Sequence, residues 1–342
     1  MKELLTRRPM AWFLGVALAP MVIAQVLLGF GVLQHVSFAT YSLVAPLAAV
    51  VLVWLEDTTP RRSRHVVIRI AVFSLVALAV ELLINLLYSR KFGAAHLRAA
   101  APTALVLGYL ASCLWSPSSL VRELVRPLFR WRVPWQRYAF AFLAVPLIVL
   151  VGVEITHFLP FVRPEHLPYL EGYVGRWLRY LPRSLLGGTI VWTPWVVAWY
   201  GFAARRLLAQ RRPLEVALLL GVLYGAAASL PGVAFGLSIE TAVLNLVGQV
   251  ALTVLAVWLY QHSQRSLLLV VILQGAYVCS AALLTLASIR MAVSYTTAVV
   301  ALDVGLSALA LVLVSIARMW LRPSGGHEAP SARRSWEADL GL

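Results

Sequence analysis

The chain has 342 residues, of which 61% are hydrophobic and only 13% are charged, and its mean hydropathy is +0.83. A soluble domain has roughly half apolar and about a quarter charged residues, so this composition predicts an all-α, polytopic membrane protein. The formal net charge is +15, but the arginines cluster between apolar runs and form no basic stripe interleaved with stacking aromatics. This distribution excludes a nucleic-acid-binding surface.

Apolar runs long enough to cross a bilayer predict a bundle of about ten transmembrane helices, within a range of about eight to ten. They cover residues 9–33, 38–55, 66–88, 100–115, 135–157, 184–206, 213–230, 239–261, 266–286 and 294–320. The first run continues to about Leu33 without an A-x-A cleavage site, which favours a retained helix over a signal peptide.

Between the fourth and fifth runs, residues 117–131 ("PSSLVRELVRPLFRW") predict an amphipathic helix lying in the membrane interface. Ser118 or Ser119 can cap its N-terminus. Leu120, Leu124 and Leu128 share one face, while arginines occupy the others. At the other end of the chain, residues 322–342 are polar and rich in Gly, Pro and Ser, which predicts disorder.

The distribution of basic residues predicts the orientation. If the N-terminus is cytoplasmic and the runs alternate sides, most of the 29 Lys and Arg residues lie on the cytoplasmic side. We therefore expect both termini in the cytoplasm. The two cysteines, Cys113 and Cys279, fall inside apolar runs and form no CxxC pair, so we expect them to be small buried hydrophobic residues.

Three segments in the second part of the chain carry a family resemblance. The first, Ala101–Leu147, holds an apolar helix, the arginine-rich connector and the helix after it. The second is "WVVAWYGFAARRLL" followed by "LLLGVLYGAAASLPGVAF", and the third is "LAVWLYQHSQRSLLLVVILQGAYVCSAA". Their order and spacing resemble the CPBP family, the bacterial relatives of type II CAAX prenyl endopeptidases, which are intramembrane metalloproteases.

The resemblance implies a division of the chain and a location. A CPBP-like helical core would cover residues 100–286, after N-terminal helices at 1–99 to which the resemblance does not extend. A last transmembrane helix at 287–321 and a cytoplasmic tail at 322–342 would follow. It also implies a bacterial cytoplasmic membrane, with the lipid bilayer and a membrane protein or lipidated peptide as partners.

Family chemistry requires an EExxxR word, a histidine on the next helix and HxxxN on a later one, which hold a metal and a general base. The matching positions here are Trp195, Val196 and Tyr200, then Ser229 (or Ala228 if the alignment is anchored on Tyr224), then Gln274 and Val278. The loss does not depend on the register chosen, because no acid occurs between Glu171 and Glu215 and no histidine between His166 and His262. We therefore predict no catalytic residues, metal or cofactor; zinc would be expected only if the family chemistry survived.

Polar groups within apolar runs are costly and are candidates for function. Glu154 and His157, at i and i+3, predict either an interfacial hydrogen-bonded pair or a weak metal or proton site. Asn245 and Gln249 predict interhelical hydrogen bonds or a polar ligand-lining stripe. Further candidates are Glu240 at the outer end of the same run, Glu81 with Asn85, Asp303 with Arg290 as a possible partner, and Gln274, whose amide can hydrogen-bond Ser229 or Tyr200.

Three functional hypotheses follow. The first is a non-catalytic CPBP-like protein that binds a lipid or peptide, regulates a partner or confers immunity. The second is an active intramembrane metalloprotease with a non-standard site built from Glu154, His157 and Glu240. The third is a small-solute transporter, although the first and second five runs show no internal repeat.

Overall fold

The computed structural model describes residues 9–29, 44–56, 97–116, 118–157, 192–233, 238–291 and 295–317, and every regular element within these ranges is helical. This confirms the all-α class. The elements are α2 (Pro9–Gly29), α4 (Val44–Glu56), α6 (Leu97–Leu114), α7 (Ser119–Val125), η1 (Arg126–Phe129), α8 (Trp135–His157), η3 (Val197–Ala204), α10 (Arg205–Gln210), α11 (Pro213–Val233), α12 (Ile239–His262), α13 (Leu267–Met291) and α14 (Tyr295–Ala317).

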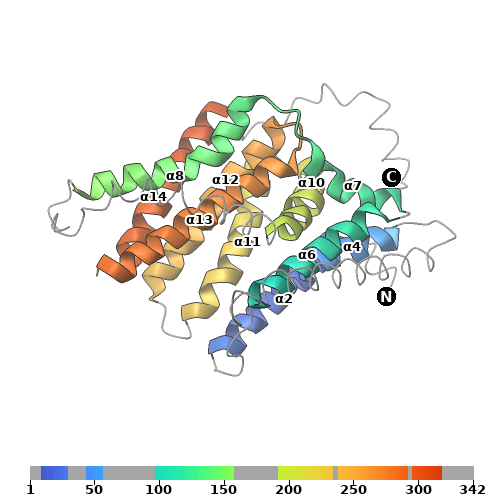
Figure 1. The fold of residues 1–342 in the computed structure, drawn as a ribbon, viewed down its shortest axis with the longest axis horizontal. Helices are drawn as coiled ribbons and strands as arrows, with labels where there is room; N and C mark the ends of the chain where they lie inside the picture. Colours follow the sequence, from blue (N-terminus) through green and yellow to red (C-terminus); the bar gives the residue numbers. More distant parts are fainter. Residues whose placement is uncertain are drawn as a thin grey trace.

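The helices form a bundle around α12, which packs against α11 and α14 and also contacts α13 (Figure 1). Helix α8 packs against α13 and α14, while α2 joins α4 to α11. The π-helix η3 lies between these groups, because it contacts α4 and α7 as well as α11, α12 and α13. Segments distant in sequence therefore meet at η3.

Close packing of α11 on α12 depends on two glycines spaced as in a GxxxG motif. A Cβ added at Gly221 would lie 2.8 Å from the Cα of Val250, and one at Gly225 would lie 3.2 Å from the Cβ of Gln249. Small residues at this spacing allow helix backbones to approach each other, which is how helices associate in lipid. This contact aligns Gln249 and its neighbours on α12 with the face of α11.

Where the structure describes both, the helix ends lie within about five residues of the predicted runs; the largest difference is at α13, which continues to Met291. Among the described residues, α12 is long and apolar enough to cross a membrane, and shorter apolar helices lie at 10–19, 213–227, 267–280 and 302–317. The number of about ten spans remains a prediction. The run at 66–88 with Glu81 and Asn85 and the tail 322–342 lie outside the described residues.

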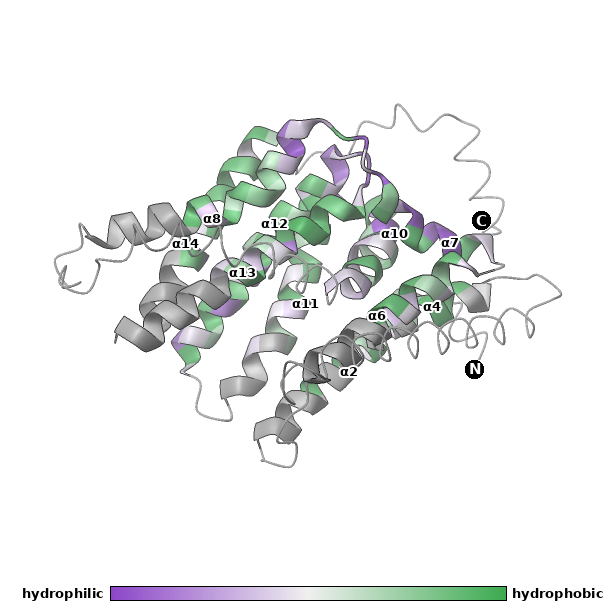
Figure 2. Ribbon diagram, viewed as in Figure 1, coloured by the Kyte–Doolittle hydropathy of each residue, from purple (hydrophilic) through white to green (hydrophobic). Residues whose placement is uncertain are grey.

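The amphipathic segment at 117–131 is helical, but it is divided. Ser118 is the N-cap of α7, where its side chain accepts a hydrogen bond from the amide of Val121. Pro127 then falls inside a short 3-10 helix, η1. Leu124 and Leu128 are buried and α7 contacts α4, α6 and η3, so its apolar face packs on the bundle. Figure 2 shows hydrophilic residues gathered at this end, around α7 and the end of α12, above mainly hydrophobic helices.

Candidate functional site

The positions that the resemblance assigns to the EExxxR word lie on and just before the π-helix η3. All eight residues of this helix are buried. Runs of π-helix are rare and are found frequently at functional sites. A Cβ added at Gly201 would lie 3.2 Å from the carbonyl oxygen of Leu124 and 3.1 Å from Leu267, so this glycine lets η3 approach α7 and α13.

Aromatic side chains fill the space beside η3. The ring of Trp195 lies 4.6 Å from Tyr224 on α11, 5.5 Å from Trp199 and 6.3 Å from Tyr200, centroid to centroid. Phe13 on α2 extends the cluster, 5.6 Å from Trp199. These separations and their edge-to-face or tilted angles are typical of favourable aromatic packing. We call these five residues the aromatic cluster.

Two of the substituted positions, one on η3 and one on α13, meet beside this cluster. The Tyr200 hydroxyl lies near the side chains of Gln274 on α13 and Thr253 on α12. Tyr200 is 1% exposed and Gln274 is 5% exposed. Within the described residues, the hydroxyl has no partner with hydrogen-bonding geometry. The predicted contact between Tyr200 and Gln274 is therefore present as a close approach of neutral polar groups, short of a hydrogen bond.

A hydrogen-bonded pair continues this polar region across α12 and α13. The side-chain amide of Gln249 donates to the Tyr277 hydroxyl at 3.1 Å, and within α12 the Thr253 hydroxyl donates to the backbone carbonyl of Gln249 at 2.7 Å. We call Tyr200, Gln249, Thr253, Gln274 and Tyr277 the polar layer. Its members are uncharged, so it can bind neutral hydrogen-bonding groups or water, but it holds no acid that could act as a general base.

The other substituted positions are also filled by packed side chains. Val196 is fully buried, and Ser229 on α11 is 4% exposed. Val278 is partly buried on α13. Within the described ranges, no three His, Cys, Asp or Glu side chains gather into a group that could hold a metal ion.

The structure describes only some of the remaining polar candidates. Glu154 and His157 lie in the last turns of α8, and their side chains are outside the described residues. Glu240 is exposed in the first turn of α12, next to the Ser238 N-cap, while Asn245 is partly buried one turn later. Of the two residues expected to share a stripe, Gln249 makes an interhelical hydrogen bond, to Tyr277 on α13. The expected burial of Cys113 and Cys279 is confirmed.

Asp303 is a buried acid in the described part of the chain, and its partner could not be assigned from sequence. It is 2% exposed on α14, and its Oδ2 atom has no hydrogen-bond partner within the described residues. Its carboxylate lies against Gly248 of α12. The side chain of Arg290, its possible partner, is outside the described residues.

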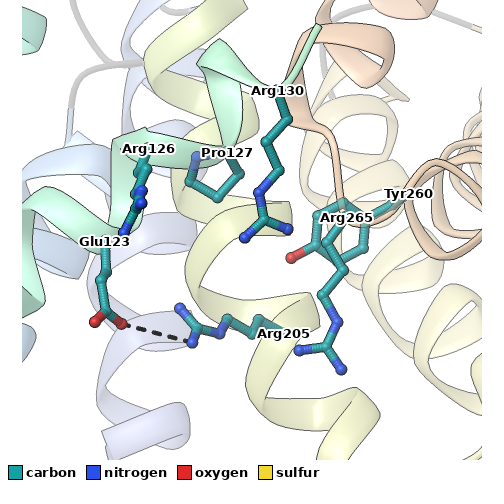
Figure 3. A pocket seen from close by; sticks show the side chains of 7 residues that line it. All are labelled: Glu123, Arg126, Pro127, Arg130, Arg205, Tyr260 and Arg265. Atoms are coloured by element: carbon teal, nitrogen blue, oxygen red, sulfur yellow. Dashed lines mark ion pairs between the residues drawn. The ribbon is translucent and has the colours of Figure 1, made fainter. Parts of the chain in front are cut away.

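A pocket was missed by sequence reasoning because its residues come from three separate segments of the chain. It is a pocket of about 250 Å³, lined by Glu123, Arg126, Pro127, Arg130, Arg205, Tyr260 and Arg265 (Figure 3). The sequence signal was present in the arginine clusters, which predict topology and, at residues 117–131, an interfacial helix with its arginines towards anionic headgroups. Which arginines share one pocket depends on how η1, α10 and the α12–α13 turn pack.

No model of a known protein family matches the chain, and a search among curated proteins finds no match either. Functional assignment therefore depends on the geometry of the fold and of the site.

Proposed function

We propose that this protein is a membrane-embedded, non-catalytic relative of the CPBP intramembrane proteases, which binds a lipidated peptide or a membrane protein without cleaving it. One observation carries the proposal. Five of the six positions that the resemblance assigns to the catalytic groups hold buried aromatic, aliphatic or neutral polar side chains, and the sixth, Val278, is partly buried.

The packing at these positions favours loss of the catalytic site over a catalytic site built from different residues. Hydrolysis needs a water-accessible space where a metal or base can activate water. Trp195 is 5% exposed and in ring contact with Tyr224, and Val196 is fully buried. Filling such a space with apolar volume removes the cost of buried charge and adds packing.

Local backbone geometry supports descent from a functional helix. A π-helix inserts extra residues into a helical turn, and its hydrogen bonds are less favourable than those of an α-helix. In this chain it covers Val197–Ala204, directly after Trp195 and Val196. Because π-helices occur frequently at functional sites, this backbone supports a former active-site helix whose side chains have changed.

The test measures metal content and proteolysis on the full chain in a neutral detergent. The purified protein is loaded with zinc, dialysed and analysed for bound metal, then incubated with a transmembrane peptide substrate. A catalytically active family member serves as the positive control in the same detergent. Gln274→Ala and Ser229→Ala variants are measured in parallel, because these residues occupy the two histidine positions.

We expect substoichiometric zinc, no cleavage, and no difference between the variants and the parent chain. One zinc per chain together with cleavage, both lost in Gln274→Ala or Ser229→Ala, would show that the proposal is wrong. Binding is tested separately with a photoreactive farnesylated peptide. Crosslinks to the chain that are suppressed by an excess of unlabelled peptide are the expected result, and no saturable crosslinking would contradict the binding role.

A further inference from the structure

The arginine-lined pocket has a composition that is unusual for a simple loop surface. Four arginines line it, at positions 126, 130, 205 and 265, whereas Glu123 is its single acid. Figure 3 shows the guanidinium groups of Arg130, Arg205 and Arg265 reaching into one space from different elements. Tyr260, which is 1% exposed, forms the inner wall. Cations held this close repel each other, so an anion bound between them would stabilise the arrangement.

The one acid does not neutralise the pocket. Glu123 pairs with Arg205 at 3.7 Å, and both side chains are about half exposed, at 50% and 41%. Exposed ion pairs of this kind contribute little to stability, roughly 0–1 kcal/mol, so a stronger anion can displace the carboxylate. Arginine's planar fork binds phosphate oxygens through two parallel hydrogen bonds, which favours phosphate as that anion.

Backbone contacts position the arginines before any ligand arrives. Arg130 donates through Nη1 to the carbonyl of Gln264 at 2.6 Å, and Ser266 donates through Oγ to the carbonyl of Arg130 at 2.8 Å. These two bonds join the end of η1 to the α12–α13 turn. A group held by such contacts loses less conformational entropy on binding.

The α12–α13 turn adopts a backbone conformation that ordinary residues rarely use. Gln264 and Arg265 have φ angles of 55° and 62°, in the left-handed region. Each such residue costs free energy, and strain of this kind is concentrated at functional sites. Here the turn directs Arg265 to the same pocket as Arg205.

The surroundings of the pocket favour a lipid as the source of the phosphate. Tyr260 lies two residues before the end of α12, the helix long and apolar enough to cross a membrane. Phe129, Trp131 and Trp135, beside the pocket arginines in sequence, are 59%, 65% and 73% exposed. Exposed aromatic side chains at a helix end are typical of the headgroup level of a bilayer.

We propose that this pocket binds a phosphate group, supplied by the headgroup of an anionic phospholipid. The preference of arginine for cytoplasmic loops explains basic residues in these segments, but it does not require them to converge on one cavity. A phosphate monoester headgroup fits best, because its charge and free oxygens match several guanidinium groups. The pocket shares no residue with the aromatic cluster or the polar layer, so this proposal goes beyond the proposed function and can fail independently of it.

The experiment is a lipid titration of the full chain in a neutral, phosphate-free detergent buffer, read by native mass spectrometry. The probes are dioctanoyl phosphatidic acid and, as the zwitterionic control, dioctanoyl phosphatidylcholine. The pocket variant is Arg205→Gln with Arg265→Gln. Its matched control is Arg132→Gln with Arg211→Gln, which removes the same charge from exposed positions that do not line the pocket.

We expect phosphatidic acid to bind at least about tenfold more tightly than phosphatidylcholine, and the pocket variant to lose this preference. The control variant should keep it. Glu123→Gln should bind phosphatidic acid more tightly, because the competing carboxylate is gone. This gain in affinity cannot result from misfolding. Equal thermal midpoints of the two double variants would show that the lost lipid preference of the pocket variant does not result from misfolding either.

Equal affinity of the parent chain for the two lipids would overturn the proposal. So would an equal loss in both double variants, since that would mean diffuse attraction without a site. Sodium phosphate is added as a competitor to separate the two sources. If inorganic phosphate displaces phosphatidic acid at comparable concentration, the site is a phosphate site and the lipid assignment is wrong; if it does not, the lipid assignment is supported.

Discussion

The carboxylate of Asp303 on α14 lies directly against the backbone of Gly248 on α12. A Cβ at position 248 would overlap both the Oδ1 and the Cγ atoms of Asp303. Because Asp303 is 2% exposed, the carboxylate cannot move into solvent without moving the helix. The absence of a side chain at Gly248 therefore determines how closely α14 approaches α12.

Replacing this glycine should loosen the α12–α14 contact. Gly248→Ala is expected to destabilise the protein by about 1–3 kcal/mol through overpacking, although alanine is the better helix former. Gly15→Ala on α2 is the matched control, because a Cβ at Gly15 meets nothing within 4 Å. The added change Asp303→Ala should restore the lost stability, because it removes the overlapping atoms. A Gly248→Ala variant as stable as the control would contradict this geometry.

Unfolding can be followed with a thiol-reactive dye, because Cys113 and Cys279 are both buried and become reactive only as the bundle opens. The same assay tests the aromatic cluster. Trp195→Ala should cost about 3–5 kcal/mol, since it removes a buried ring that contacts Tyr224, Trp199 and Tyr200. Trp135→Ala, at a position 73% exposed, is the control and should change the midpoint little. Similar midpoints for the two variants would show that Trp195 is not packed as described.

The polar layer is tested by the bond between Gln249 and Tyr277, 3.1 Å long, which joins α12 to α13. Gln249→Leu, Tyr277→Phe and the double variant form a double-mutant cycle. We expect a favourable coupling free energy of about 0.5–1.5 kcal/mol, the usual net contribution of an intramolecular hydrogen bond. Additive single effects would mean that the two side chains do not interact.

The left-handed turn between α12 and α13 should discriminate between residues that adopt positive φ and those that do not. Gln264→Gly keeps the carbonyl that accepts from Arg130 and relieves the strain at φ 55°, so it should be tolerated without loss of stability. Gln264→Val should destabilise by about 1–2 kcal/mol, because a β-branched residue is poorly accommodated there. If glycine proves the worse of the two, the turn does not have this conformation.

The helices and their ends could be predicted from local patterns. Runs of apolar residues predicted the positions of α8, α11 and α12 to within a few residues, because hydrophobic length and intrinsic helix formation are properties of short segments. Ser118 was also predictable as a cap, since capping depends on a side chain and an amide three residues later. The division of the next segment into α7 and η1 follows from Pro127, whose ring and missing N–H disfavour a continuous helix.

The candidate site could be predicted only in part from local sequence patterns. The sequence by itself determined the absence of any acid from Gly172 to Leu214, and hence that no general base could come from the helix carrying Trp195 and Tyr200. Only the tertiary structure decided that Tyr200 meets Gln274 and Thr253, that Asp303 lies on Gly248, and that arginines from η1, α10 and the α12–α13 turn share one pocket. Composition along one helix is a local property, whereas contacts between helices depend on crossing angles and on close approach at positions such as Gly221, which small side chains permit but do not specify.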